Sequence, residues 1–255
     1  MTNPYSIVIT TFDQRFEPFL KPLITQIQSE RPGIEIIVMI NGLCKAPFNP
    51  FYRQHVLRFL ADQPNCFPTV FPNFQSLAKM WNRGILNATN ERVLVLNDDL
   101  TIHPSSTSPA AGFFASLEQS LMNYPRSFKV NGSFSHYVIN RTELIEVGFF
   151  DERLLGLGEE DGDFCWRYHE RYDDEIRSIT IPGIDNVQSD LADPGYAKGI
   201  RTAGIFNRQF IKQKKYRDVL IGGYRGMFDK RVKKQITDEK QYPYEDFYLA
   251  HRDEV

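Results

Sequence analysis

Short apolar strands alternate with helical stretches in the N-terminal part of the chain, and this alternation constrains the fold more than any other feature. The runs Ser6–Thr11, Ile34–Ile40 and Val93–Leu96 are rich in β-branched and aliphatic residues, as is typical of strands buried on both faces. Between them, Phe16–Arg31 and Leu77–Ala88 carry apolar residues at helical spacing. The pattern predicts an α/β fold with a mostly parallel, Rossmann-like central sheet and helices on both faces.

Polar residues follow each of these three predicted strands. The first strand ends in Thr11-Phe12-Asp13, the second in Asn41-Gly42, and the third in Asn97-Asp98-Asp99. Ligands of open α/β sheets bind beyond the carboxyl ends of the strands, so we expect a functional site there. Adjacent carboxylates cannot both be buried without a counter-charge, and a divalent metal ion would supply one. The alternative is that Asn-Asp-Asp is ordinary turn sequence.

A second acidic cluster lies further along the chain, where four carboxylates fall within the five residues from Glu159 to Asp163. The helix dipole favours acids at a helix start, which explains one or two of them. Four would repel one another unless cations or hydroxyl-bearing ligands share the site. The preceding turn, Val147–Arg153, is interpreted as structural. His136 is interpreted as structural too, with a role in binding a ligand as the alternative.

Composition excludes several classes of protein. The chain has 255 residues, a formal net charge of -2 and three cysteines without CxxC spacing, so a disulfide framework or a zinc site is not expected. The apolar run Ile36–Ile40 is far shorter than the roughly 20 residues of a membrane span. The start Met1–Pro4 lacks the features of a secretory signal. We therefore expect a cytoplasmic protein that does not bind nucleic acid.

The charge is distributed unevenly. The segment Ile205–Gln235 contains ten Lys and Arg residues and two Asp residues, which gives it a charge of +8. Aromatic and aliphatic residues are interleaved with these charges, a composition typical of segments at a membrane interface. We predict one α/β domain over residues 1–204 and a basic, aromatic helical tail over 205–255. The tail either contacts the inner membrane face peripherally or packs on the domain with its charges in solvent.

Taken together, the order and separation of these clusters resemble glycosyltransferase family 2, whose fold is called GT-A. The resemblance extends from about Ser6 to about Ser189. It rests on six stretches in sequence: Ser6–Asp13, Glu35–Gly42, Asn82–Ile85, Asn97–Asp99, Gly148–Glu152 and Glu160–Asp163. The resemblance implies transfer of a sugar from a nucleotide-sugar to a hydroxyl acceptor, with inversion and with the help of Mn²⁺ or Mg²⁺.

The resemblance also implies roles for individual residues. Asp99 matches the metal ligand of the family's Asp-x-Asp motif, in which Asn97 replaces the first Asp. Asp161 matches the general base, with Glu160 beside it. The expected donor-binding residues are Thr11, Asp13, Asn41, Lys79, Asn82, Asn97 and Asp98.

The chain departs from the family pattern at two places. Asn41 stands where the family often has an Asp that contacts the nucleotide, which leaves the nucleotide's identity open. No late His follows the acidic motif, so Asp185 or Asn186 would have to replace it, or phosphate and water would complete the metal shell.

The expected function is therefore a metal-dependent inverting glycosyltransferase in surface polysaccharide or glycan biosynthesis. Its donor is expected to be a UDP-sugar and its acceptor a glycan or a lipid-linked molecule. The alternative is a non-catalytic relative that binds a sugar nucleotide or acts as a scaffold subunit. Nucleotidyl transfer ranks lower, because no Gly-rich phosphate loop follows the first strand.

Overall fold

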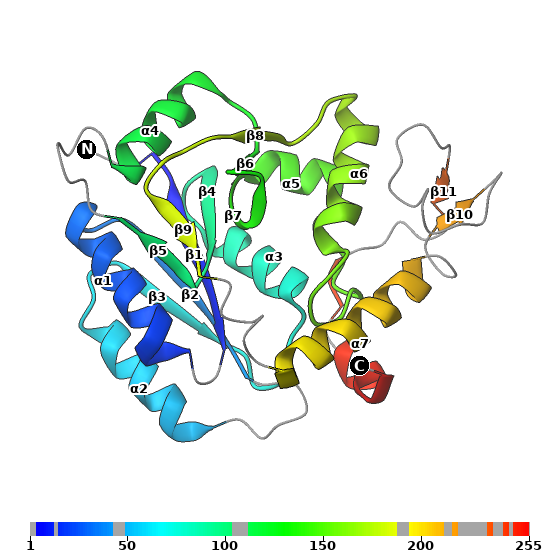
Figure 1. Cartoon of the computed structure of the whole chain (residues 1–255), viewed down its shortest axis with the longest axis horizontal. Helices are drawn as coiled ribbons and strands as arrows, with labels where there is room; N and C mark the ends of the chain where they lie inside the picture. The colour runs from blue at the N-terminus through cyan, green and yellow to red at the C-terminus, as the bar shows by residue number, and fades with distance from the viewer. Residues whose placement is uncertain are drawn as a thin grey trace. The chain divides into compact units, whose positions relative to one another are not determined.

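The chain divides into two compact units in the computed structural model (Figure 1). Unit 1 comprises Met1–Phe74, Arg83–Glu143 and Arg177–Ser189, and unit 2 comprises Gln75–Asn82, Leu144–Ile176 and Asp190–Val255. The structure describes residues 4–12, 15–42, 49–103, 112–187, 194–211, 216–218, 234–236, 242–244 and 247–254.

A seven-stranded sheet forms the centre of unit 1 within the described residues, in the order β3-β2-β1-β4-β7-β6-β8. Strand β1 runs parallel to β2 and β4, β2 runs parallel to β3, and β7 is antiparallel to β4 and β6. The predicted mostly parallel sheet is thus confirmed, with an antiparallel strand beside its parallel part. The strand bounds are β1 Ser6–Phe12, β2 Ile36–Asn41, β3 Cys66–Val70, β4 Arg92–Asn97, β6 Phe128–Val130, β7 Ser133–Asn140 and β8 Arg177–Ile179.

Helices and short strand pairs complete the described chain. The helices are α1 Lys21–Glu30, α2 Pro50–Ala61, α3 Leu77–Asn87, α4 Phe113–Asn123, α5 Arg141–Val147, α6 Glu160–Tyr172, α7 Pro194–Phe210 and α8 Phe247–His251, with a 3-10 turn at Arg252–Glu254. The short pairs are β5 Leu100–Ile102 with β9 Ile184–Asn186, and β10 Tyr216–Asp218 with β11 Lys234–Ile236. Within the described part of the chain, no helix is long and apolar enough to cross a bilayer.

The predicted helix Phe16–Arg31 begins with a π-helical segment, η1 Phe16–Leu20, before α1 starts at Lys21. Pro22 has no N–H to donate to the carbonyl group one turn earlier, so a regular α-helical turn cannot close there. Helix α1 then ends at Glu30, just before Pro32-Gly33. The predicted strands Ser6–Thr11, Ile34–Ile40 and Val93–Leu96 and the predicted helix Leu77–Ala88 agree with the structure to within two residues. The stretch 205–255, which the sequence predicts to be helical, contains the end of α7 and α8, but its described residues also include the strand pair β10–β11.

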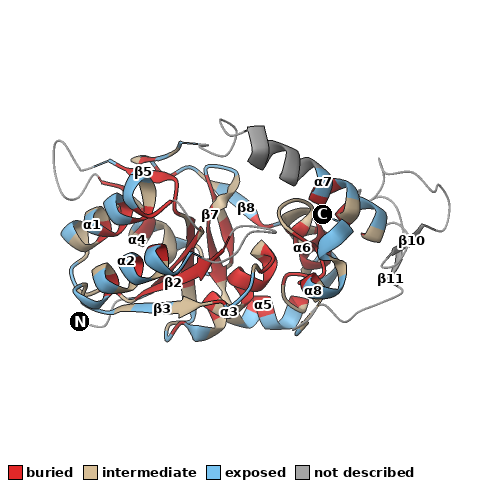
Figure 2. Ribbon diagram, turned by 90° about the horizontal axis from the view of Figure 1, so that it is seen from below, coloured by how far each residue is buried: buried red, intermediate tan, exposed pale blue. Residues whose placement is uncertain are grey.

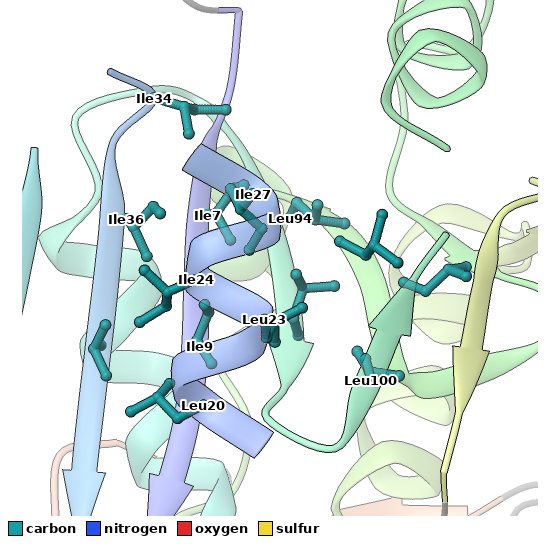
Figure 3. Packing of buried hydrophobic residues seen from close by; sticks show 14 of the residues in the cluster. Ile7, Ile9, Leu20, Leu23, Ile24, Ile27, Ile34, Ile36, Leu94 and Leu100 are labelled. Atoms are coloured by element: carbon teal, nitrogen blue, oxygen red, sulfur yellow. The ribbon is translucent and has the colours of Figure 1, made fainter. Parts of the chain in front are cut away.

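The apolar core of unit 1 lies between α1 and the parallel strands (Figure 3). Leu20, Leu23, Ile24 and Ile27 lie on one face of η1 and α1, at the spacing that the helical period requires, and they are buried. Figure 2 shows the complementary pattern, with exposed residues along the outer faces of α1 and α2. Each such side chain contributes roughly 1.5–3 kcal/mol when it is fully buried.

Gly84 permits the close packing of α3 against the other side of this sheet. A Cβ atom at this position would lie 2.5 Å from Cγ1 of Val8 and 3.2 Å from Cγ of Met39. Real Cβ contacts are longer than this, so only glycine fits without a shift of the neighbouring atoms.

Unit 2 has its own core of aromatic and aliphatic side chains. Leu154, Trp166 and Ile211 form a buried cluster, and Phe210 packs against it. Phe150 stacks on Phe164 with ring centroids 4.3 Å apart. The described part of the C-terminal segment therefore supplies apolar residues to this core.

Candidate functional site

A buried ionic cluster lies in unit 1 where β4 ends. Asp98 and Asp99 form a turn between β4 and β5, and each residue is 2% exposed. The Arg15 side chain donates a 2.7 Å hydrogen bond from Nε to Oδ1 of Asp98, and its Nη2 forms ion pairs with Oδ1 of Asp98 at 2.6 Å and Oδ2 of Asp99 at 3.2 Å. Thr11 Oγ1 donates to Oδ2 of Asp98 at 2.6 Å. A guanidinium thus supplies a counter-charge to these buried carboxylates, a contact that the sequence analysis, which proposed a divalent metal ion, did not include.

Arg15 is a functional candidate that the sequence analysis missed. It is 6% exposed, and its guanidinium lies 4.6 Å from the ring centroid of Phe12 and 5.0 Å from that of Phe19. Aromatic faces attract a guanidinium that has lost its water. The sequence does carry one indication of this role, because Arg15 comes shortly after the first strand and has aromatic residues on both sides. Burial raises the pKa of Asp98 to about 6, although Arg15 and Thr11 both act to lower it.

The polar residues Asn97 and Asn41, also predicted at this sheet edge, make hydrogen bonds at the ends of their strands. Asn97 Oδ1 accepts a hydrogen bond from Thr10 Oγ1 at 3.3 Å, and Asn41 Oδ1 accepts one from the Gly42 backbone N–H at 3.1 Å. Both are strand-end residues of the parallel part of the sheet. Asp13 lies outside the described residues.

Strand β9 passes beside the acidic turn. The Val187 backbone N–H donates to the Asp99 carbonyl oxygen at 2.9 Å, and Asn186 pairs with Leu100 in the strand register. The Asn186 side chain donates to Ser135 Oγ at 2.9 Å. The exposed Asp185 carboxylate instead lies 2.7 Å from Nε2 of His103. Of the two residues considered as replacements for the late His, Asn186 is the one nearer to Asp99 in the strand register, because it pairs with Leu100 whereas Asp185 pairs with Thr101.

His136 is buried on β7, opposite Leu96. Its Nδ1 makes a 2.8 Å hydrogen bond with Ser135 Oγ. Its Nε2 atom has no hydrogen-bond partner within the described residues. Burial lowers the pKa of this imidazole, so the neutral form is favoured.

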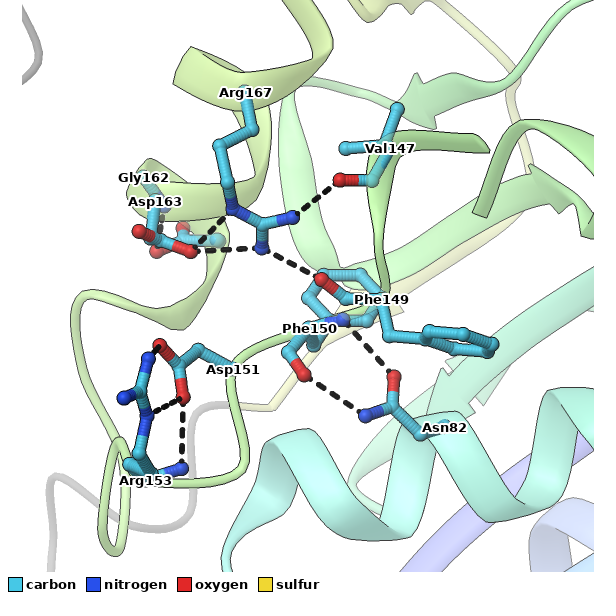
Figure 4. A network of polar contacts seen from close by, with 10 residues as sticks. Asn82, Val147, Phe149, Phe150, Asp151, Arg153, Gly162, Asp163 and Arg167 are labelled. Atoms are coloured by element: carbon cyan, nitrogen blue, oxygen red, sulfur yellow. Dashed lines mark hydrogen bonds and ion pairs between the residues drawn. The ribbon is translucent and has the colours of Figure 1, made fainter. Parts of the chain in front are cut away.

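The second acidic cluster forms the start of α6 in unit 2, and its four carboxylates have different environments. Asp163 is fully buried and pairs with Arg167 one turn later, at 2.9 and 2.8 Å (Figure 4). Glu159 accepts from Arg208 Nε at 2.7 Å. These two acids are therefore held by arginines of unit 2.

Glu160 and Asp161 differ in burial. Glu160 is buried, and its Oε2 accepts a 2.6 Å hydrogen bond from the Gly158 backbone N–H. Burial, followed by the charge of Asp161, raises the pKa of Glu160 to about 8. Asp161 is half-buried, and its Oδ1 accepts from the Gly162 backbone N–H at 2.8 Å. At neutral pH Glu160 thus holds a proton most of the time.

Lys79 and Asn82 lie on α3 within unit 2, where they hold other segments of this unit. Asn82 brackets the Phe150 backbone, with Oδ1 accepting from N–H at 3.0 Å and Nδ2 donating to the carbonyl at 2.9 Å (Figure 4). Its Nδ2 also lies 3.2 Å from Oε1 of Glu152. Lys79 Nζ donates to the Tyr244 carbonyl at 3.0 Å. Both residues are buried.

The turn before α6 is structural, as the sequence indicated. Asp151 is fully buried, and its Oδ1 accepts from the backbone N–H and Nε of Arg153 at 3.0 and 2.9 Å. Its Oδ2 accepts from Nη2 of the same arginine at 2.9 Å.

The predicted site residues fall into two groups. Four lie at one sheet edge of unit 1, namely Thr11, Asn97, Asp98 and Asp99, and four lie in unit 2, namely Lys79, Asn82, Glu160 and Asp161.

A mostly parallel sheet with carboxylates at the end of a central strand, followed in the chain by an acidic helix start, defines the GT-A class of glycosyltransferases. The sequence matches the family described as Glycosyl transferase family 2 over residues 6–169, which is more than half of the chain. The chain belongs to this family and is a glycosyltransferase.

Solved structures share this fold at low sequence identity. S. aureus TarS is 11% identical with a TM-score of 0.51, over 84% of this chain and 40% of TarS. Glucosyl-3-phosphoglycerate synthase from Mycobacterium tuberculosis is 13% identical with a TM-score of 0.51, over 78% of this chain and 77% of the synthase. The mannosyltransferase PcManGT from Pyrobaculum calidifontis is 14% identical with a TM-score of 0.51, over 71% of this chain and 55% of that enzyme. A search of curated protein sequences finds no significant match.

Proposed function

We propose that this glycosyltransferase moves a sugar from a nucleotide-sugar to an acceptor hydroxyl with inversion at the anomeric carbon, assisted by Mn²⁺ or Mg²⁺. The observation that carries the proposal is the buried cluster of Arg15, Asp98 and Asp99 at the end of β4. Support also comes from two enzymes of the same fold: the M. tuberculosis synthase was solved with Mn²⁺ and UDP, and PcManGT with GDP-Man and Mn²⁺.

The chemistry of the acidic turn fits a divalent ion bound through few protein ligands. Both oxygens of Asp98 are engaged by Arg15 and Thr11, whereas Oδ2 of Asp99 lies at the longer distance of 3.2 Å from Nη2 of Arg15. Within the described residues, no three acidic, His or Cys side chains cluster as a complete metal site. Asp99 would therefore hold the ion, with Asn186 as the nearest candidate to assist and diphosphate oxygens supplying further ligands.

When bound, the metal ion would stabilise the negative charge that develops on the leaving diphosphate. The chain's own contribution is a fixed acidic turn. The Arg15 guanidinium holds the Asp98 carboxylate from one side and Thr11 holds it from the other, so the adjacent Asp99 needs no reorganisation when the donor arrives. Thr11, Asp13, Asn41, Asn97 and Asp98 remain our proposed donor-side residues.

For the general base we propose Asp161. An acceptor hydroxyl is a poor nucleophile until a positioned carboxylate takes its proton. Glu160 is unsuited to this role, because burial raises its pKa to about 8 and it is protonated at neutral pH. For Lys79 and Asn82 we propose an indirect role on the donor side, since their contacts hold the Phe150–Glu152 turn and Tyr244.

For the C-terminal segment, residues 205–255, we keep the proposal of a peripheral contact with an anionic membrane. Among its Lys and Arg residues, only Arg208 and Arg252 have side chains that the structure describes. Its described aromatic residues support the competing arrangement, in which the segment packs on the rest of the protein. The ring centroids of Phe210 and Tyr244 lie 4.9 and 5.0 Å from Cζ of Arg153. Co-sedimentation with anionic vesicles, at low and high salt, separates the two arrangements.

The proposed reaction is tested by incubating the protein with a panel of UDP- and GDP-sugars, with and without Mn²⁺, and measuring release of the nucleoside diphosphate. We expect metal-dependent hydrolysis of at least one donor in the absence of acceptor. Binding of a nucleotide-sugar without any hydrolysis or transfer would favour the non-catalytic alternative.

A further inference from the structure

Asn207, near the end of α7, makes three hydrogen bonds to the loop that leads into the acidic motif. Its Oδ1 accepts from the Leu155 backbone N–H at 2.7 Å, and its Nδ2 donates to the carbonyl oxygens of Leu155 at 2.9 Å and Gly158 at 2.7 Å. The residue is fully buried. Each buried donor or acceptor that lost its partner here would reduce the stability of the protein by about 1–3 kcal/mol. The three bonds of Asn207 therefore hold the loop firmly in place.

The loop continues directly to the carboxylate beside the proposed base. Gly158 donates its backbone N–H to Oε2 of Glu160 at 2.6 Å, while its carbonyl oxygen is the one that Asn207 holds. A chain of two hydrogen bonds thus runs from Asn207 through the Gly158 peptide groups to Glu160. Asp161 follows in the first turn of α6.

The backbone of this loop adopts conformations that need support. Gly156, Gly158 and Glu159 have φ angles of 62°, 114° and 77°, all in the left-handed half of the map. A non-glycine residue such as Glu159 enters this region only when the surrounding structure holds it there. At Gly156 an added Cβ would lie 2.8 Å from Cβ of Ala203, so the loop packs directly against α7.

We propose that Asn207 is a positioning residue for glycosyl transfer, holding the Leu155–Glu159 loop so that Glu160 and Asp161 begin α6 in the geometry the reaction needs. This inference rests on the proposed role of Asp161. It also gives the end of α7 a role in supporting the reaction, although the charge pattern of the sequence assigned these residues to a separate tail.

The test uses three substitutions in the full-length chain. Asn207→Asp keeps the size and the oxygen that accepts from Leu155, but it loses both donor bonds and places a carboxylate against two carbonyl groups. Asn207→Ala loses all three bonds. The matched control is Gln209→Ala, because Gln209 is exposed on the same helix.

We expect kcat to fall about 10- to 100-fold in both Asn207 variants, because displacing a catalytic group by about 1 Å can cost this much. The KM for the donor and the affinity for the nucleoside diphosphate should stay within about twofold, since the donor-side residues of unit 1 are unchanged. Hydrogen exchange should show the Leu155 amide protected in Asn207→Asp and exposed in Asn207→Ala, whereas the Gly158 amide loses protection in both. The control should match the wild type in each measurement.

Rates are divided by the folded fraction measured by circular dichroism, so that partial unfolding does not imitate the effect. A folded fraction that turns over at the wild-type rate in both Asn207 variants would overturn the inference, as would a fall in kcat matched by an equal loss of donor affinity. A wild-type protein without turnover would instead count against the proposed function.

Discussion

Nε of Arg15 donates a 2.7 Å hydrogen bond to Oδ1 of Asp98, Nη2 of the same guanidinium forms a 2.6 Å ion pair with that oxygen, and both residues are almost completely buried. These two residues lie far apart in the sequence, in the loop after β1 and in the turn after β4. Their pairing ties together the ends of two neighbouring parallel strands. It also supplies positive charge to a turn that would otherwise bury carboxylates alone.

Breaking this buried pair should destabilise the protein strongly. We predict that Arg15→Gln lowers the free energy of unfolding by about 3–5 kcal/mol, because it leaves the Asp98 charge buried without its partner. Urea denaturation measures the change. The matched control is Lys21→Gln, which removes an exposed pair with Glu17 on the neighbouring helix and should cost less than about 1 kcal/mol. Equal effects of the two substitutions would contradict the structural role of Arg15.

Gly84 should not tolerate a side chain. Gly84→Ala places a Cβ 2.5 Å from the Val8 side chain, and we expect a net loss of about 1–3 kcal/mol of stability from overpacking. Alanine has a higher helix propensity than glycine, so a Gly→Ala substitution in a helix should increase stability where there is space for the added Cβ. Gly204→Ala on α7 is that control, since nothing lies within 4 Å of its added Cβ. Thermal unfolding measures both changes, and a Gly84→Ala variant as stable as the wild type would contradict the close packing of α3 on β1.

His136 makes stability depend on pH. Its folded-state pKa lies below the ordinary value of 6.5, so below about pH 6.5 the unfolded chain binds a proton that the folded chain resists. The stabilising contribution is therefore complete above that pH and declines as the pH falls through it. We predict that the difference in unfolding free energy between wild type and His136→Gln shrinks from pH 7.5 to 5. A difference that stays constant across this window would show that the imidazole does not titrate in this way.

Asp99 should determine metal binding. We expect Asp99→Ala to lose Mn²⁺ binding in the presence of the nucleoside diphosphate, because both oxygens of the neighbouring Asp98 carboxylate are already engaged by Arg15 and Thr11. Titration of the ion followed by electron paramagnetic resonance measures free and bound Mn²⁺ directly. Asp185→Ala serves as the control, since the Asp185 carboxylate pairs with His103 on the exposed side of β9. Unchanged Mn²⁺ affinity in Asp99→Ala would remove Asp99 from the metal site.

The fold could be predicted from the sequence where local pattern and tertiary structure agree. Strands β1, β2 and β4 are β-branched runs that end in polar residues, and the apolar spacing of α1 marks its buried face. The antiparallel strand β7 was not predicted, because Ser133–Asn140 mixes polar and apolar residues and its pairing with β4 is a long-range choice.

The polar contacts were predicted less well, because they depend on residues that only the folded chain brings together. The sequence indicated that the Asp98-Asp99 turn needs a cation, but it did not indicate Arg15. It marked Asp163 as one acid among four, whereas the structure pairs it with Arg167. Nothing local to Asn207 shows that its amide meets a loop about fifty residues earlier.

The role of Asp161 tests the account most directly. The measurement is the turnover number of Asp161→Asn with a saturating donor and Mn²⁺, beside Glu160→Gln, which imitates the protonated carboxyl that Glu160 carries at neutral pH. We predict that Asp161→Asn loses roughly 100-fold or more in kcat with donor affinity unchanged, and that Glu160→Gln loses far less. Nearly full turnover in Asp161→Asn would contradict the account and would require another group to take the proton of the acceptor.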